Sequence, residues 1–122
     1  MQQYFSSTVT SVGADAHELI EGGVVILFGE PCPQELADVS VLHVASSPPQ
    51  RDPRPGDTLR VADDVVTIEA VGGLAGDNLR TLGHVVVYLD PEEGSSLLPG
   101  ALHARGRIGA PPAGAVIELI GA

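Results

Sequence analysis

Residues 39–47 read Val-Ser-Val-Leu-His-Val-Ala-Ser-Ser, and Pro48 and Pro49 follow them. Apolar side chains fall on both faces of this segment, which is typical of a strand inside a sheet, whereas the two prolines cannot continue a central strand. The segment therefore predicts a buried strand that runs through His43 into a loop. An imidazole in this place is either a core histidine with its N–H groups satisfied or a nucleophile that the loop leaves open to a reacting group.

Other segments on both sides of this strand are also rich in β-branched residues. Residues 4–12 and 24–28 precede it, and residues 58–71 contain two strand-like segments around Asp63 and Asp64, which suit a tight turn. Short helical turns are predicted at residues 15–20, 34–37 and 76–83. We therefore predict an all-β fold, a small and mostly antiparallel barrel or sandwich of about seven short strands with one to three short helical turns.

The length of the chain, 122 residues, is that of one domain, and the sequence shows no linker, low-complexity segment or repeat. We expect residues 1–122 to form a single domain. The first residues lack the basic start and apolar run of a signal peptide, and the longest apolar run, residues 24–28, is far too short to span a membrane. These features predict a cytoplasmic protein that does not insert into a membrane.

The charge of the chain is strongly negative, with 16 acidic residues against six basic ones and a formal net charge of −10. Binding to nucleic acid needs a basic face that replaces counterions, so nucleic acid is not expected as a partner. An anionic membrane surface would also repel this chain. The acidic surface either serves solubility or steers the chain toward a basic protein partner.

The sequence contains few patterns of the common catalytic and metal-binding sites. The four histidines lie far apart without an HxH or HExxH pattern, and no GxSxG or P-loop motif is present. We therefore expect no metal and no bound cofactor. A metal site would require the fold to gather His43, His84 and His103.

Four short motifs occur in an order that is also found in a known family. They are Val41-Leu42-His43, Ala70-Val71-Gly72 leading into Asp77-Asn78-Leu79-Arg80, Leu82-Gly83-His84-Val85, and Pro99-Gly100-Ala101-Leu102-His103 running to residues 113–116. In this order and spacing, from Thr8 to Leu119, the chain resembles the glucitol/sorbitol-specific IIA components of the bacterial phosphotransferase system (PTS). The motif Val41-Leu42-His43 stands at the place of the segment whose histidine carries the phosphoryl group in that family.

The resemblance implies a barrel-like all-β fold and a phosphoryl relay through His43, with the transient phosphoryl group as the only group carried. HPr would be the donor, and the IIB and IIC membrane components of a sugar-alcohol transporter would be the acceptor. The second ring nitrogen of His43 should donate to a carbonyl or carboxylate, and a nearby donor should meet the phosphoryl oxygens. Candidates for that donor are Arg80, His84, Asn78, His103 and the loop amides around Ser46 and Ser47.

Three points stay open at this level. The segment after His43 departs from the family pattern because Pro48 and Pro49 follow it, and the proline-rich loop of residues 46–57 is either a docking surface or a passive connector. An edge strand could pair two copies into a homodimer. A non-catalytic binding module of the same fold, in which His43 is only a packed core residue, is the alternative function.

Overall fold

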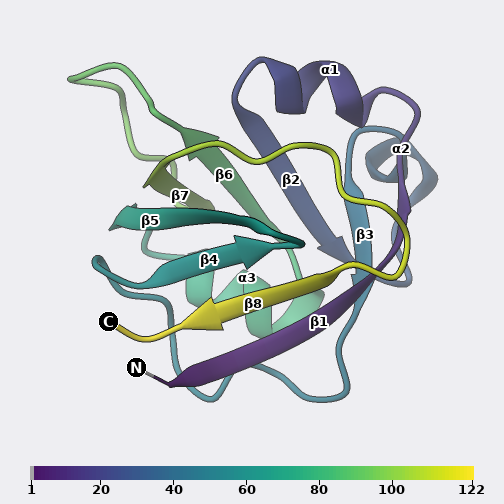
Figure 1. Cartoon of the computed structure of the whole chain (residues 1–122), viewed down its shortest axis with the longest axis horizontal. Helices are drawn as coiled ribbons and strands as arrows, with labels where there is room; N and C mark the ends of the chain where they lie inside the picture. Colours follow the sequence, from purple (N-terminus) through teal and green to yellow (C-terminus); the bar gives the residue numbers. More distant parts are fainter. Residues whose placement is uncertain (1) are drawn as a thin grey trace.

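Eight strands close into a barrel in the order β1-β3-β2-β6-β7-β5-β4-β8 (Figure 1). The computed structural model describes residues 2–122. Its elements are β1 Gln3–Val12, α1 Ala16–Glu21, β2 Val24–Gly29, α2 Gln34–Ala37, β3 Val41–Val44, β4 Thr58–Val61, β5 Asp64–Val71, α3 Ala75–Leu82, β6 Val85–Leu89, β7 Ala101–Arg105 and β8 Val116–Ile120.

The predicted all-β fold with few short helices is confirmed, and the barrel, not the sandwich, is the architecture. The barrel has eight strands where about seven were predicted, and even β3 and β4, of only four residues each, both pair with two neighbours. The pairing is mostly antiparallel as predicted, but β2–β3 and β6–β7 are parallel. Within residues 2–122 this closure leaves no edge strand of the kind that suggested strand pairing between two copies.

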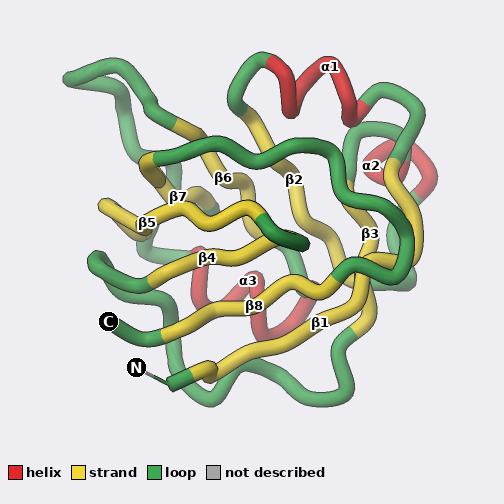
Figure 2. Tube along the Cα trace, in the orientation of Figure 1, coloured by secondary structure: helices red, strands yellow, loops and turns green. Residues whose placement is uncertain are grey.

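The barrel interior is filled by the inward-facing residues of the strands, mostly Val, Leu and Ile. Alternation along β5 shows the rule, since Val66 and Ile68 are 1% exposed whereas Val65 is 55% exposed. Helices α1 and α3 each bury one apolar side against this core, and Figure 2 shows them on different sides of the barrel. No helix among residues 2–122 is both long and apolar enough to cross a membrane.

The two halves of the chain repeat one topology, which the sequence did not reveal. In the first half β1 pairs antiparallel with β3, and β3 pairs parallel with β2; β5, β7 and β6 repeat this arrangement in the second half. The ladder irregularity recurs in the same place, since Val9 faces His43 before one bulge and Ile68 faces Ala104 before the other.

Most side chains differ between the halves, so the repeat is carried by backbone geometry. Gly13 and Gly72 are an exception, and they follow β1 and β5 at equivalent places. A Cβ atom at either glycine would collide with a backbone carbonyl oxygen, that of Ala37 or that of Leu98. Helix α2 has no helical counterpart in the second half, where an irregular segment links β6 to β7.

Candidate functional site

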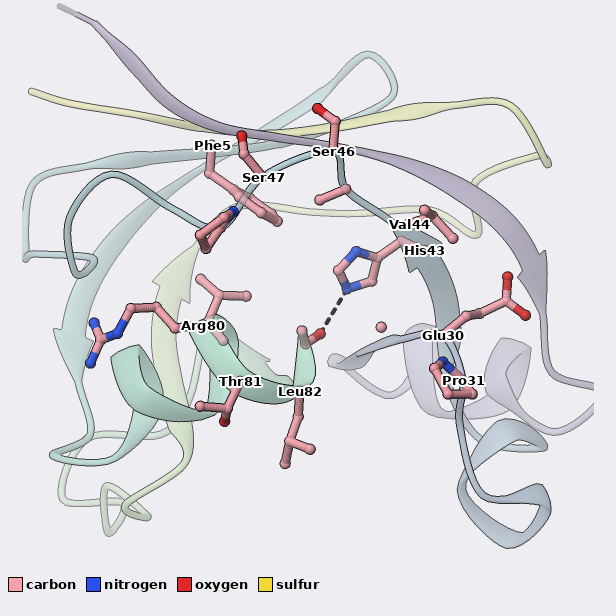
Figure 3. Close-up of a pocket in the computed structure, with 15 residues that line it drawn as sticks. Phe5, Glu30, Pro31, His43, Val44, Ser46, Ser47, Arg80, Thr81 and Leu82 are labelled. Carbon is pink, nitrogen blue, oxygen red and sulfur yellow. Dashed lines mark hydrogen bonds between the residues drawn. The ribbon is translucent and has the colours of Figure 1, made fainter.

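A pocket of about 540 Å³ opens where β3 ends beside the C-terminus of α3 (Figure 3). His43, on β3, forms part of its wall, so the residue predicted as the nucleophile borders a cavity of the protein. Residues 45–48, at the start of the proline-rich loop, form another part of the wall. The remaining lining residues are Phe5, Gly29, Glu30, Pro31, Val44, Leu79, Arg80, Thr81, Leu82 and Gly83.

Both ring nitrogens of His43 have hydrogen-bond partners inside the protein. Nε2 lies 2.7 Å from the carbonyl oxygen of Gly83, and Nδ1 lies 2.5 Å from the hydroxyl oxygen of Ser7. A carbonyl only accepts, so Nε2 carries the proton and donates it, and Nδ1 accepts from the Ser7 hydroxyl. The ring is therefore held as a single neutral tautomer, and its residue is only 1% exposed.

The surroundings of His43 favour the uncharged imidazole. Burial lowers the pKa of His43 from its ordinary value, and the hydrogen bond to the Gly83 carbonyl offsets part of this effect. The ring of Phe5 meets the imidazole edge to face, with centroids 6.3 Å apart, and adds to the apolar shell. A neutral imidazole keeps a lone pair on one nitrogen, which is the form that a nucleophile requires.

The end of α3 brings the Gly83 carbonyl to the ring. Gly83 ends the helix in the left-handed conformation, with φ of 63°. A Cβ atom at this position would lie 2.8 Å from Cα of Gly29 and 3.2 Å from Cε1 of His43. The close approach of the Gly83 backbone to the Gly29 backbone and to the His43 ring therefore requires glycine here. It also directs a carbonyl from the negative end of the helix to the imidazole N–H.

The proline-rich loop is fixed to the barrel by a buried carboxylate. Asp57, 2% exposed, accepts hydrogen bonds from the Tyr4 hydroxyl at 2.7 Å and from both terminal nitrogens of Arg51, at 2.9 and 3.0 Å. The Arg51 guanidinium also stacks on the Tyr4 ring, 4.0 Å from its centroid. Burial acts to raise the pKa of Asp57, but the hydrogen bonds from Arg51 and Tyr4 lower it to about 2. The loop whose first residues line the pocket is thus an ordered wall.

The four other candidate side chains do not meet the His43 ring. Arg80 lies on the pocket wall, but its guanidinium pairs with Asp52 and Asp77 and points away from His43 (Figure 3). His84 packs against Phe28, with ring centroids 4.6 Å apart, and its Nδ1 lies 3.1 Å from the carbonyl oxygen of Leu27. Neither arrangement places a donor beside the imidazole.

Asn78 and His103 lie outside the wall of this pocket. Asn78 is half-buried on α3, and His103 on β7 packs edge to face on Tyr88, with centroids 6.0 Å apart. The fold does not gather His43, His84 and His103, and residues 2–122 contain no group of three His, Cys, Asp or Glu side chains that could hold a metal ion. Ser46 and Ser47, whose loop amides were also candidates, do line the pocket.

Sequence reasoning missed both partners of the imidazole. Ser7 is one of several hydroxyl residues in β1, and its residue type alone does not distinguish it from Ser6 or Thr8. Gly83 could be predicted as a helix end, but the direction of its carbonyl depends on how α3 packs against the barrel. The alternation of inward and outward residues along β1 was the only signal, since it places Ser7 on the same face as Phe5 and Val9.

Comparison with known proteins agrees with this architecture. The family model for the PTS system glucitol/sorbitol-specific IIA component matches residues 4–118. The glucitol/sorbitol-specific EIIA components of Shigella flexneri and of Escherichia coli (strain K12) are each 29% identical to this chain over 108 residues, which is 88% of this chain and 86% of the relative.

A solved structure has the same fold. The crystal structure of a PTS system IIA component from Enterococcus faecalis V583 matches with a TM-score of 0.86 at 23% identity, covering 94% of this chain and 98% of that chain. The barrel is therefore shared with an experimentally determined IIA component. Since the family model matches most of the sequence, from the first strand to the last, this chain belongs to the family of PTS glucitol/sorbitol-specific IIA components.

Proposed function

We propose that this phosphotransferase system protein carries a phosphoryl group on His43, receiving it from phospho-HPr and passing it to a IIB component. The observation that carries the proposal is that the His43 imidazole is uncharged and held in one orientation. His43 is a neutral imidazole on a pocket wall, and one N–H is held by the Gly83 carbonyl at 2.7 Å. A single neutral imidazole is sufficient for a phosphoryl relay because positioning dominates this reaction.

The transfer step balances without a further co-reactant. The unprotonated nitrogen of His43 attacks the phosphorus of the donor phosphohistidine in line, a new N–P bond forms, and the donor N–P bond breaks with its electron pair returning to the donor ring. Gly83 lines the pocket and Ser7 does not, so Nε2 is the attacking nitrogen; the ring proton first moves to Nδ1 by exchange with solvent and stays there during the transfer. Transfer onward to the IIB component is the same displacement in which the His43 nitrogen is the leaving group.

Transfer requires the His43 ring to become reachable. The residue is 1% exposed and both nitrogens have hydrogen-bond partners, so the incoming phosphorus must displace the Gly83 carbonyl from Nε2, while Nδ1 keeps its contact with Ser7. The adjoining pocket of about 540 Å³ supplies the space. Ser46 and Ser47, which line the same pocket, supply hydroxyl and backbone N–H donors for the phosphoryl oxygens.

The surface around the pocket suits a protein donor. Val44 and Leu82 line the pocket, yet they are 50% and 49% exposed, so they present apolar surface beside the ring. The net charge of −10 attracts a basic partner over a longer range. HPr as donor and the IIB component as acceptor are the partners that this proposal assigns, and the IIC component then imports the sugar alcohol.

A second candidate function is a binding module in which His43 has only a structural role. The burial of His43 and the hydrogen bonds at both of its ring nitrogens favour this second function, because a core histidine with a structural role has the same environment. The two candidates differ in one observable property, the formation of a phosphohistidine.

The test is incubation with labelled phosphoenolpyruvate, enzyme I and HPr. The relay predicts an acid-labile, base-stable label on the wild-type chain that is absent from His43→Gln. His103→Gln is the matched control, since this histidine lies outside the pocket wall, and it should be labelled like the wild type. Circular dichroism of each variant verifies the fold. An unlabelled wild-type chain beside an HPr that phosphorylates another IIA component would reject the relay and support the binding module.

A further inference from the structure

The internal repeat offers a built-in comparison for the residues around His43. Val9 faces His43 in the first half, and Ile68 faces Ala104 in the second. Counting two residues back along each strand, Ser7 on β1 is equivalent to Val66 on β5. The first half of the barrel thus has both His43 and Ser7, whereas the second half has Ala104 and Val66 at the equivalent positions.

The barrel itself does not need the Ser7 hydroxyl. Ser7 is 3% exposed and Val66 is 1% exposed, so the fold accepts an apolar side chain at this buried position. A buried hydroxyl is unfavourable unless it forms a hydrogen bond, and the side-chain partner of Ser7 is Nδ1 of His43. The serine is therefore explained by the imidazole and not by the packing of the strand.

The Gly83 carbonyl shows the same difference between the halves. Gly23 is the counterpart of Gly83, since it follows α1 and precedes β2 as Gly83 follows α3 and precedes β6. Both have a positive φ, 91° at Gly23 and 63° at Gly83. The Gly23 carbonyl accepts a backbone hydrogen bond from Leu89 at 2.8 Å. The Gly83 carbonyl accepts from the imidazole of His43 instead. The Ser7 hydroxyl and the Gly83 carbonyl thus bind the His43 ring in the first half, and their counterparts in the second half bind no histidine.

We infer that Ser7 is a positioning residue for His43, a role that rests on the proposed relay. Its hydroxyl and the Gly83 carbonyl hold the ring from opposite nitrogens, in one orientation beside the pocket. A hydroxyl both donates and accepts, so Ser7 also suits the tautomer with the proton on Nδ1, whereas the carbonyl only suits a protonated Nε2. Ser7 can therefore keep the ring aligned when phosphoryl transfer requires the proton to change nitrogen.

The test is Ser7→Val, which reproduces the residue at the equivalent position of the second half. We expect kcat for phosphorylation by phospho-HPr to fall about tenfold, as for the loss of one orienting hydrogen bond. The KM for HPr should stay unchanged, because the buried Ser7 does not reach a docked partner. Nitrogen NMR should show Nδ1 of His43 moving toward the signal of an unbonded ring nitrogen, which verifies that the contact is lost; a purely structural contact would give this shift with kcat unchanged.

Two further variants complete the experiment. Ser7→Thr restores the hydroxyl and should restore kcat and the NMR signal; Val66→Thr adds a hydroxyl to the half without histidine and should leave kcat unchanged. Wild-type kcat and an unmoved Nδ1 signal in Ser7→Val would overturn the role of Ser7 alone. An unlabelled wild-type chain would overturn the relay and this role together, while the NMR signal would still report whether the Ser7–His43 contact exists.

Discussion

Substitution of Gly83 by alanine tests the contact between helix α3 and the candidate site. The left-handed φ of 63° costs an alanine about 1–2 kcal/mol. The added Cβ would also lie 2.8 Å from Cα of Gly29 and 2.9 Å from its backbone nitrogen, and forced overpacking of this kind costs about 1–3 kcal/mol. We therefore expect Gly83→Ala to lower the free energy of unfolding by about 2–5 kcal/mol.

The matched control is Gly94→Ala. Gly94 also has a positive φ, 85°, but no atom lies within 4 Å of the Cβ that would be added there. The free energy of unfolding of this variant should fall only by the cost of the left-handed backbone, about 1–2 kcal/mol. Urea unfolding measures both, and an unchanged slope would show that the two denatured states are alike. Equal losses for the two variants would refute the close approach of Gly83 to β2 and His43, and with it the reason for glycine at this position.

Two further predictions concern the buried polar groups. Tyr4→Phe removes one of the hydrogen bonds to Asp57 and should cost about 1 kcal/mol in urea unfolding, because the carboxylate keeps its bonds from Arg51; no loss of stability would contradict the buried contact. The lowered pKa of His43 means that the unfolded chain binds its proton more readily than the folded chain. Stability should therefore fall as the pH drops below about 6.5, the ordinary value of histidine, and the fall should be smaller in His43→Gln; equal pH profiles for the two proteins would exclude this linkage.

The repeat explains how one barrel can contain a single candidate site. Two equivalent cavities exist, the one at His43 and one of about 630 Å³ lined by Gly23, Leu89 and Asp90, whose counterparts are Gly83, Gly29 and Glu30. His43 lines the first cavity, whereas Ala104, at the equivalent position of β7, does not line the second. The fold thus forms the cavity twice, but only the first half of the chain has the histidine and the serine that binds it.

The sequence by itself determined the kind of fold and the central residue of the candidate site. β-branched segments separated by glycine and proline are sufficient to predict short strands, because strand propensity and turn chemistry are local properties. The segment through His43 predicted a buried strand that ends in a loop, and β3 followed by the ordered wall of residues 45–48 agrees with that prediction. The motif order also led to the family to which the chain belongs.

Only the tertiary structure decided which groups meet the imidazole. Ser7 and Gly83 are 36 and 40 residues away from His43 in the chain, and their contacts depend on the β1–β3 register and on the packing of α3. Arg80, one of the candidate donors, pairs instead with two carboxylates at the surface. The internal repeat was hidden for the same reason, because hydrogen-bond register and backbone approach can be preserved while most side chains change.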